Sequence, residues 1–497
     1  MPEWLKITML LLIYLGFAPL AGVMLRPYRD GQRAVFFLMM FLTMLHYRLI
    51  STSPGFPHDF FYRGHTRGFE CTLMEVMAMI LLFSGRGPAR LQGPWIPPGF
   101  WLYLLYCFAA LLSIFNSPNP SFTLMAFVKF SKVVVVFMAA FHFFREEEDI
   151  HFWLKSSSVI LIFQALVCLV QKYHFHIHQV HAWFEHQNSM VMYTYLLALP
   201  ILSVALLPLR NLRDTSLYIA GFVSAGICAV MALSRAGMVA FATGAGIVVF
   251  LSFLDRITFK RMAIVSAMSF LTVLGAIFVA HSVIARFEAG VNFFSENTRE
   301  LLNESSREMI ADHPLLGTGW NTYGIMINPP YDYGNNFDEF ARSIGHSRYV
   351  DSQFGKPISE SWYYLVMAET GMLGIATLLL FALTLLFWSG RAVWKYRHTF
   401  LGAVAIGLFA GLCMNYFQSN YERVLTQPKN MAAWMICLGL VARIEWWRRQ
   451  KHLCKAPACT MVTTPASPIA VIPRPVPTTS RAVIISPPGP HIRPHPG

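Results

Sequence analysis

Two lysines stand inside a run of otherwise apolar residues. Lys129 and Lys132 lie three positions apart in the stretch FTLMAFVKFSKVVVVF, about 12–16 Å from the end of the run at 1.5 Å per helical residue. A charge at that depth in a membrane costs on the order of 2.5–3.5 kcal/mol and is functional by default. The alternative is a structural ion pair with Glu369, which lies at similar depth in a later apolar run. Substrate binding and charge pairing both remain open for these lysines.

Three arginines are candidates to bind an anionic group. Arg235 lies in a short turn, LSRAG, between the apolar runs 216–232 and 237–254, and Arg299 and Arg307 share one later polar segment. The planar guanidinium matches phosphate oxygens, and a fixed cation stabilises negative charge that develops on a leaving group. The alternatives are an Arg235 side chain that extends to lipid headgroups and solvated arginines on a surface helix.

A carboxylate and a group of histidines complete the candidate chemistry. Glu360 stands at the end of the longest polar segment, where a carboxylate shielded from water is suited to take a proton from a hydroxyl group. A solvated loop-edge glutamate is the alternative. Residues 173–186, YHFHIHQVHAWFEH, are rich in histidine, but no carboxylate or cysteine spacing there supports a defined metal site. We therefore expect no metal.

These residues belong to a chain suited to a membrane. It has 497 residues, of which 55% are hydrophobic and only 13% charged, and its mean hydropathy is +0.47. Soluble domains carry about 25% charged residues. About thirteen apolar runs approach the roughly 20 residues that a helix needs to cross the hydrocarbon core. The runs are 5–24, 34–50, 70–83, 99–115, 122–144, 152–171, 187–208, 216–232, 237–254, 262–281, 361–388, 400–418 and 430–446. The sequence therefore predicts an all-α, polytopic bundle of about 12–13 transmembrane helices, with the short 70–83 run leaving the count open.

The basic residues alternate along these runs. Lys and Arg follow the odd-numbered runs, as with Arg26 and Arg29 after the first and Arg448 after the last, while Arg63 and Arg67 after the second are exceptions. Cytoplasmic loops carry this excess, so the odd-numbered exits are predicted to be cytoplasmic. The net charge of +13 then reflects topology and does not indicate nucleic acid.

The longest polar segment between runs, 282–360, is predicted to be extracytoplasmic because it follows an even-numbered run. Inside it, Asn297 followed by Glu300 is typical of a helix start, and an apolar stripe continues to a break at Pro314. A Gly-Thr-Gly turn follows. We expect short helices in this loop, one of them lying over the outer face of the membrane.

Four short motifs occur in the order expected for a known family. SSREMIADHPLLGTGWNTYG places an Arg before a His-Pro-Leu-x-Gly-x-Gly turn, and SWYYLVMAETGMLG contains Ala-Glu-x-Gly-x-x-Gly. LSRAGMVAF supplies Ser-Arg-x-Gly, and FEHQNSMVMYTYLLALP supplies Phe-x-x-x-Asn before a run that ends in Pro. Together they resemble the O-antigen ligase and O-antigen polymerase superfamily over roughly residues 184–377.

The resemblance implies transfer of a glycan from a polyprenyl diphosphate carrier to an acceptor outside the cytoplasmic membrane, with no cofactor and no metal. A lipid, glycan or protein acceptor would make the protein a ligase, an O-antigen or exopolysaccharide polymerase, or a protein O-oligosaccharyltransferase. A small-anion transporter is the alternative from another class, although no internal repeat typical of transporters is seen. The expected location is the inner membrane, with membrane lipids as partners and an active periplasmic face.

The motifs, the depth of the lysines and the positions of the arginines together give the expected roles of single residues. The residues expected to be catalytic are Arg235, Arg307, Glu360 and His346, and those expected to bind substrate are Lys129, Lys132, Asn188, Arg299, His313 and Glu369. Family members often carry His-Asn just before the Ala-Glu-x-Gly helix, where this chain has Glu360 and Ser361. Either a carboxylate has taken the role of the base, or His346 reaches in from the loop, or the chain belongs to a divergent subfamily with another acceptor.

These features divide the chain into consecutive regions. N-terminal transmembrane helices occupy 1–183, the ligase-like core with its loop occupies 184–377, and C-terminal transmembrane helices occupy 378–447. The tail, 448–497, is rich in proline without a packing period and is predicted to be a disordered cytoplasmic segment.

Overall fold

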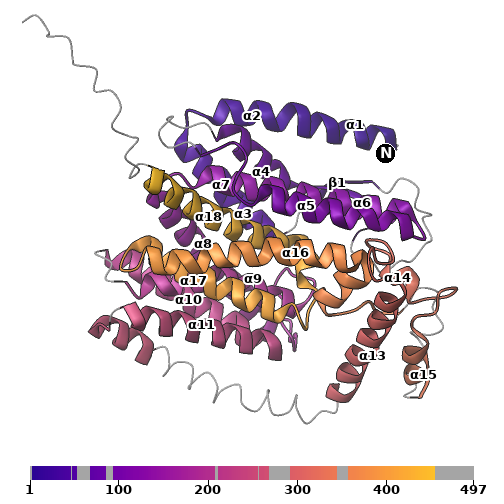
Figure 1. Cartoon of the computed structure of the whole chain (residues 1–497). Coiled ribbons are helices and arrows are strands. Elements are labelled where there is room, and N and C mark those ends of the chain that lie inside the picture. Colours follow the sequence, from indigo (N-terminus) through magenta and orange to yellow (C-terminus); the bar gives the residue numbers. More distant parts are fainter. Residues whose placement is uncertain are drawn as a thin grey trace, which may run out of the picture. The chain divides into compact units, whose positions relative to one another are not determined.

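The computed structural model describes residues 3–45, 48–52, 66, 68–85, 93–207, 211–255, 257–267, 291–343 and 356–453. Across these ranges the fold is almost entirely helical (Figure 1). One short antiparallel pair joins β1 (Arg48–Thr52) to β2 (Phe69–Thr72). The prediction of an all-α polytopic bundle is confirmed.

The helices follow one another along the chain, and their bounds show where the predicted runs ended. They are α1 (Glu3–Leu11), the π-helix η1 (Leu12–Phe17), α2 (Ala18–Leu25), α3 (Arg29–Leu45), α4 (Leu73–Ser84), α5 (Phe100–Leu111), η3 (Leu112–Asn116), α6 (Pro120–Lys132), α7 (Val134–Phe143), α8 (Glu147–Tyr173), α9 (Gln187–Ala205), α10 (Leu212–Met231), α11 (Arg235–Asp255), α13 (Val291–Asp312), α14 (Tyr323–Met326), α15 (Asn335–Ser343), α16 (Trp362–Lys395), α17 (Phe400–Gln418), η5 (Val424–Thr426) and α18 (Pro428–Leu453). Met1–Arg449 form one compact unit. Of the second unit, Gln450–Gly497, the structure describes only the last residues of α18, so the helix extends past residue 447 and most of the predicted tail lies outside the described residues.

Every predicted apolar run overlaps a described helix except 262–281, most of which lies outside the described residues, and the runs 34–50 and 70–83 also include residues of β1 and β2. Within the described ranges, 8 helical segments are long and apolar enough to cross a membrane. That is fewer than the predicted number, because some runs form shorter or more charged helices. The helix α4 has 12 residues, and α18 carries Lys429, Arg443 and Glu445 among its apolar residues. The 8 segments are Trp4–Leu25, Pro120–Phe143, Glu147–Tyr173, Gln187–Ala205, Leu212–Met231, Arg235–Asp255, Trp362–Lys395 and Phe400–Gln418.

The helix α9 forms the centre of the bundle. All of its residues from Asn188 to Ala205 are buried, and it packs against α8, α10, α11 and α17. Its contact with α17 is close because α17 has glycines there: a Cβ added to Gly407 would lie 2.3 Å from Pro200 Cα. Since α9 runs through the core, a polar residue in its first turn, such as Asn188, is held at a defined place at one end of the bundle.

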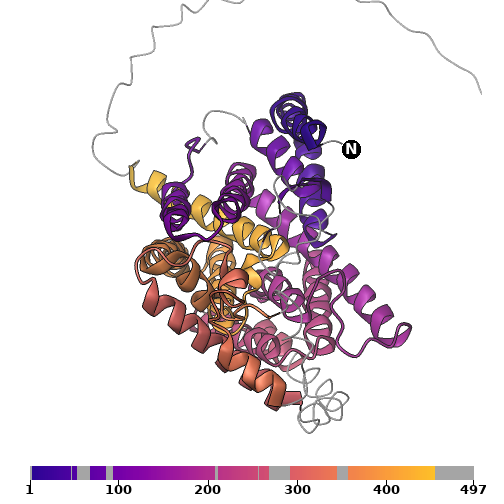
Figure 2. The ribbon, with the colours of Figure 1, turned by 90° about the vertical axis from the view of Figure 1, so that its right-hand side faces the viewer.

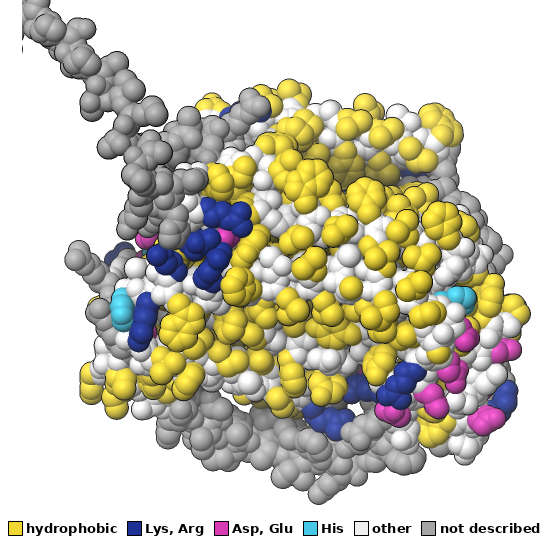
Figure 3. All heavy atoms as spheres, in the orientation of Figure 1, with side chains coloured by type: hydrophobic (Ala, Val, Ile, Leu, Met, Phe, Trp, Pro, Cys, Tyr) yellow, Lys and Arg dark blue, Asp and Glu magenta, His cyan; other side chains and the backbone are white. Residues whose placement is uncertain are grey.

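The outer surface separates into an apolar band and two polar ends. Large apolar side chains are exposed around the bundle, among them Leu15, Phe115 and Phe387, which fits contact with lipid. On the face seen in Figure 3, this band lies between a group of Lys and Arg side chains at one end and Asp and Glu side chains, with some Lys and Arg among them, at the other. A basic group surrounds Glu445, where Arg391 and Arg448 form ion pairs with the carboxylate at 2.6 and 2.7 Å.

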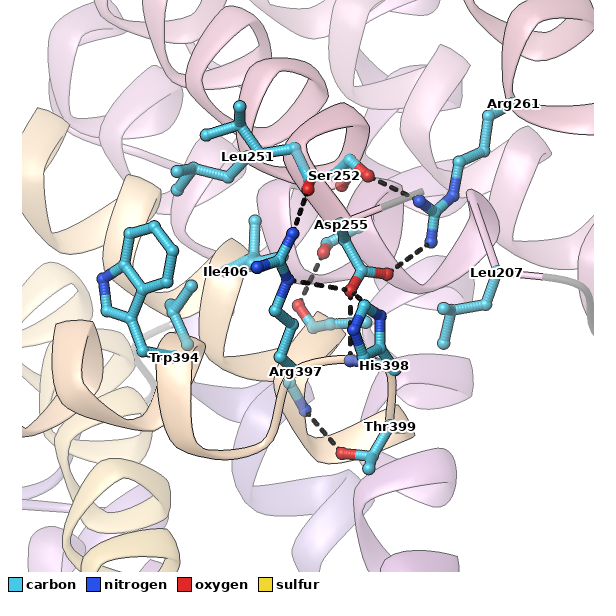
Figure 4. A pocket seen from close by; sticks show the side chains of 15 residues that line it. Leu207, Leu251, Ser252, Asp255, Arg261, Trp394, Arg397, His398, Thr399 and Ile406 are labelled. Carbon is cyan, nitrogen blue, oxygen red and sulfur yellow. Dashed lines mark hydrogen bonds and ion pairs between the residues drawn. The ribbon is translucent and has the colours of Figure 1, made fainter. Parts of the chain in front are cut away.

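A pocket at the basic end shows how the cations also hold helix ends together (Figure 4). Arg261 and Arg397 both point toward Asp255, the last residue of α11, with N–O distances of 3.2 and 3.6 Å. The Arg261 guanidinium also donates to the carbonyls of Leu206 and Ser252, near the C-terminal ends of α9 and α11. Because these cations bind backbone carbonyls and a buried carboxylate at helix ends, the residues of this pocket serve to hold the helices together.

The opposite end carries the long loop, in which α13, α14 and α15 lie (Figure 1). Seen from that end, α13 lies across the bundle (Figure 2). Leu302 and Met309 of α13 are buried in a small apolar cluster with Tyr323 and with Leu365 of α16. The predicted surface helix therefore exists and ends near Pro314, although α13 begins at Val291, before the predicted start at Asn297.

Candidate active site

The turn that follows α13 docks onto a break in α16. Gly371 lies inside α16 with a φ of 64°, which interrupts the regular helix. The turn supplies partners for the interrupted backbone: Thr318 N donates to Ala368 O at 2.9 Å, Gly319 N donates to Glu369 O at 3.0 Å, and Met372 N donates to Pro314 O at 2.8 Å. The two motifs, His-Pro-Leu-Leu-Gly-Thr-Gly and Ala-Glu-Thr-Gly, are thus two halves of one backbone junction.

Glycine is required on both sides of this junction. Gly317 and Gly319 have φ values of 73° and 115°, a region that side chains with a Cβ rarely adopt. A Cβ added to Gly317 would lie 2.4 Å from the carbonyl carbon of Glu369, and one added to Gly371 would lie 2.3 Å from Leu315 O. The spacing of glycines in both motifs therefore serves close backbone approach.

The same turn is anchored on its other side by the N-terminal half of the bundle. Trp320 is buried, and its N–H donates to Ser113 Oγ at 2.8 Å while its carbonyl accepts from Thr123 Oγ1 at 3.2 Å. Glu369 is also buried and accepts a hydrogen bond from Tyr323 N at 3.1 Å, which fixes the start of α14. In the structure, Glu369 holds the loop in place, and His313 contributes its carbonyl to the turn by accepting from Gly317 N at 3.0 Å.

Beside this junction, four polar side chains from distant parts of the chain meet. Arg299 of α13 lies with Nε 2.5 Å from an oxygen of Glu360, which stands just before α16, and with a terminal nitrogen 3.1 Å from Glu422 Oε1. Glu422 lies between α17 and α18, and the same Oε1 accepts a hydrogen bond from Asn188 Nδ2 in the first turn of α9. We refer to Asn188, Arg299, Glu360 and Glu422 as the acid–arginine cluster.

The two carboxylates of the cluster differ in their surroundings. The Glu360 side chain is 40% exposed, whereas that of Glu422 is 8% exposed. Burial, and next the negative charge of Glu360, raise the pKa of Glu422 to about 7, although Arg299 and Arg423 oppose this shift. Burial likewise lowers the pKa of His186, which caps α9 beside the cluster. The site thus pairs an accessible acid with a buried one whose charge depends on nearby cations.

Arg235 lies at the same end of the bundle. It is the first residue of α11, where Ser234 Oγ accepts a hydrogen bond from Gly237 N at 3.1 Å. A Cβ added to Gly237 would lie 2.8 Å from Val191 of α9, one helical turn beyond Asn188. The Ser-Arg-Ala-Gly motif therefore packs the start of α11 against the first turns of α9, which contribute to the cluster.

Arg307 occupies a different environment from Arg299, although both stand on α13. Its side chain is 55% exposed, and it contacts Glu300 at 3.4 Å and the ring of Tyr364 at 5.6 Å from the centroid. The structure therefore places Arg299, and not Arg307, between the carboxylates. His346, the alternative base, lies outside the described residues.

The two intramembrane lysines line a cavity next to the turn. Lys129 and Lys132 face it together with Glu70 and Glu75, and Pro428 and Met431 of α18 close it. Thr66 also lines the cavity and exchanges hydrogen bonds of 3.2 and 2.9 Å with Asn321 of the turn. The cavity therefore borders both the turn and the start of α18, which follows the segment that carries Glu422.

The carboxylate partner of Lys132 is Glu75, not the Glu369 that the sequence suggested. Lys132 Nζ lies 2.9 Å from Glu75 Oε1, and Tyr14 donates to the other oxygen of Glu75 at 2.8 Å. Sequence position placed Lys132 and Glu369 at a similar depth, but it did not show in which direction their side chains point. The short helix α4 begins deep enough for Glu75, in its first turn, to reach the lysine.

Glu75, Glu422 and Arg423 were not identified from the sequence. The signal for Glu422 and Arg423 is a charged pair in the short polar turn between the runs 400–418 and 430–446, which the predicted topology places on the same side as the long loop. Within the described residues, no group of three or more His, Cys, Asp or Glu is arranged to hold a metal ion.

Comparison with known proteins gives one family. The family model for O-antigen ligase matches residues 220–376, a stretch that includes Arg235, Arg299, Glu360 and the junction between the turn and α16. The match supports membership of the O-antigen ligase-like family of membrane glycan transferases. Asn188 and Glu422 lie outside the matched segment. No curated protein matches the chain.

Proposed function

We propose that this protein transfers a glycan from a polyprenyl diphosphate carrier to an acceptor hydroxyl at the extracytoplasmic face of the membrane, as an O-antigen ligase-type enzyme. The acid–arginine cluster carries the proposal, because it brings Arg299 and Glu360 of the family-matched segment together with Asn188 and Glu422 from outside it. A cation for the leaving group and a carboxylate for the acceptor proton are the two groups that such a transfer needs.

The charge distribution supports an extracytoplasmic position for the cluster. Glu360 stands just before α16, whereas Arg391, near the end of α16, joins the basic group around Glu445. By the positive-inside rule the basic end belongs on the cytoplasmic side. The cluster and the loop of residues 282–360 then face the periplasm, on the inner membrane.

In the proposed reaction, the acceptor oxygen attacks the anomeric carbon of the donor sugar. The bond from that carbon to the phosphate oxygen breaks, and the lipid diphosphate leaves with the bonding electrons. Glu360 receives the acceptor proton, since its exposed carboxylate is open to an incoming hydroxyl. Arg299 and Arg235 bind the diphosphate oxygens, and Arg299 takes the place of Arg307 because Arg307 is turned toward Glu300.

The lysine cavity borders the start of α18, which follows the segment that carries Glu422. Lys132 already has Glu75 as an ionic partner, so its charge is partly neutralised in the resting protein. We assign to Lys129, which lines the same cavity, attraction of the diphosphate as the carrier approaches from the lipid. This assignment agrees with the cost of placing charges at that depth without a function.

Purified protein in detergent, supplied with a polyprenyl-diphosphate-linked glycan and an acceptor, tests the proposal directly. We expect glycan transfer that persists in the presence of a metal chelator. Consumption of the donor in the absence of a transferred product, or no reaction with any lipid, glycan or protein acceptor, would contradict it.

Deletion of the gene, followed by gel analysis of surface glycans, distinguishes the acceptors. Loss of the glycan ladder from its lipid anchor indicates a ligase, and collapse to a single repeat indicates a polymerase. An intact ladder with unglycosylated secreted proteins indicates a protein O-oligosaccharyltransferase.

A further inference from the structure

Arg299 is shared by two acids. Its guanidinium contacts Glu360 through Nε and Glu422 through a terminal nitrogen, so the cation assigned to the diphosphate is already occupied. Glu422 receives a second donor, Asn188 Nδ2, on the same oxygen. An incoming diphosphate must therefore compete with two carboxylates for one arginine.

The groups that face Glu422 come from several elements. They are Glu360 before α16, Arg299 of α13, Asn188 of α9 and the neighbouring Arg423 after α17. His186 at the start of α9 faces Glu360, Arg299 and Arg423 as well. In this set, burial and Glu360 disfavour a charge on Glu422, while the two arginines and the asparagine favour it.

A diphosphate that draws Arg299 away changes this balance. Glu422 loses one of the cations that stabilise its charged form and meets new negative charge nearby, while it remains buried. We propose that Glu422 takes up a proton when a diphosphate binds Arg299, so that donor binding and the protonation of this acid are coupled through one guanidinium. The inference rests on the proposed function, because it needs a diphosphate ligand at Arg299.

The coupling has a chemical use. With Glu422 neutral, the incoming diphosphate meets one carboxylate instead of two, and that one is the accessible Glu360, which remains charged to receive the acceptor proton. The proton on Glu422 comes from solvent and returns to it when the lipid diphosphate leaves and Arg299 pairs with the acids again. By linkage, the proton that Glu422 takes up makes the affinity for the diphosphate fall as the pH rises.

Titration calorimetry with a sugar-free polyprenyl diphosphate measures this uptake without catalysis. The lipid is titrated into purified full-length protein at pH 7.5, in phosphate-free buffers that differ in ionisation enthalpy. We expect uptake of roughly half to three quarters of a proton per bound lipid, and a dissociation constant that rises by up to about tenfold per pH unit. The Glu422→Gln variant should bind the lipid with little or no proton uptake.

A matched variant, Glu300→Gln, removes an exposed acid on the same helix that pairs with Arg307 and should retain the uptake. Binding to the unmodified protein with no proton uptake and no pH dependence would overturn the inference and leave the proposed function standing. Equal uptake by the unmodified protein and by Glu422→Gln would overturn it too. Failure of the unmodified protein to bind the lipid would contradict the proposed function itself, and the inference with it. The pH dependence of the unmodified protein needs no variant, so a poorly folded Glu422→Gln would not remove the test.

Discussion

Glu422 makes the stability of the folded protein depend on pH. Its pKa is raised from 4.5 to about 7 by burial and Glu360, so the folded state holds its proton more tightly than the unfolded state. The stability that this adds is fully present below about pH 4.5 and is lost as the pH rises through about 7, a change on the order of 3 kcal/mol. We expect the melting temperature of the unmodified protein to fall over this window more than that of Glu422→Gln. Parallel curves for the two proteins, measured in detergent, would show that Glu422 titrates normally.

Lys132 and Glu75 form an ion pair, and mutation can distinguish its structural role from a role in substrate binding. Glu75→Gln leaves Lys132 without its carboxylate in a mostly apolar cavity, and we expect a loss on the order of 3 kcal/mol of stability. The double variant with Lys132→Gln should recover part of this loss, because neither charge is then buried alone. If the double variant folds but binds lipid diphosphate more weakly, the lysine serves both roles. Stability is measured by thermal unfolding. If Glu75→Gln is as stable as the unmodified protein, the ion pair is not structural.

Some residues of the candidate site could be predicted from the sequence, and others could not, for a physical reason. Asn188 and Glu360 were predicted as site residues from the motifs and Arg299 from its position on the loop helix, and the structure brings the three into one cluster. Glu422 stands in a turn without a motif, so only three-dimensional packing could show its partner. The depth of Lys132 along its helix can be read from the sequence and restricts which acids can reach it. The direction in which each side chain points depends on how the helices are rotated against one another, and hydropathy does not encode that rotation. Lys132 therefore pairs with Glu75 and not with the acid expected from depth.

The helix α16 depends on its interruption at Gly371. A methyl group at this residue would force a left-handed conformation on alanine and would approach Leu315 O, so the turn could not dock. We expect Gly371→Ala to cost at least about 1–2 kcal/mol, to expose residues 313–326 to proteases and to lower glycan transfer. Limited proteolysis and thermal unfolding measure both effects.

The matched variant is Gly246→Ala in α11. No atom lies within 4 Å of the added Cβ, and alanine favours a helix over glycine by up to about 1 kcal/mol. This variant should be unchanged or slightly stabilised. If both alanine variants behave alike, the junction between the turn and α16 is not needed for the fold.

The elements were largely predictable because apolar runs of this length have few alternatives to helix in a membrane. The break inside α16 was not, since the run 361–388 is apolar over most of its length and Gly371 resembles any other helical glycine in sequence. For the same reason the sequence did not predict that the turn around Trp320 is buried between α16 and the helices that carry Ser113 and Thr123.

For the whole molecule, the orientation in the membrane is the property on which the proposed reaction depends. Asn335 of α15 and Lys395 at the end of α16 are both exposed and stand at the loop end and at the basic end. In a cysteine-free background, cysteine at 335 should react with a membrane-impermeant maleimide in intact spheroplasts. Cysteine at 395 should react only after the membrane is permeabilised. The reverse pattern would place the loop in the cytoplasm and remove the donor from the site.

The assignment of Arg299 to the diphosphate is tested most directly by comparing two arginines of the same helix. Glycan transfer from a polyprenyl diphosphate donor is measured with the purified protein and with Arg299→Ala, Arg307→Ala and Arg235→Ala. Removing a fixed donor to a developing charge typically costs a factor of about 10²–10³ in rate, and we expect such losses for Arg299→Ala and Arg235→Ala. Arg307→Ala, which removes an exposed side chain, should remain within about threefold of the unmodified protein. Near-normal transfer by Arg299→Ala, with or without loss in Arg307→Ala, would contradict a catalytic role for the acid–arginine cluster.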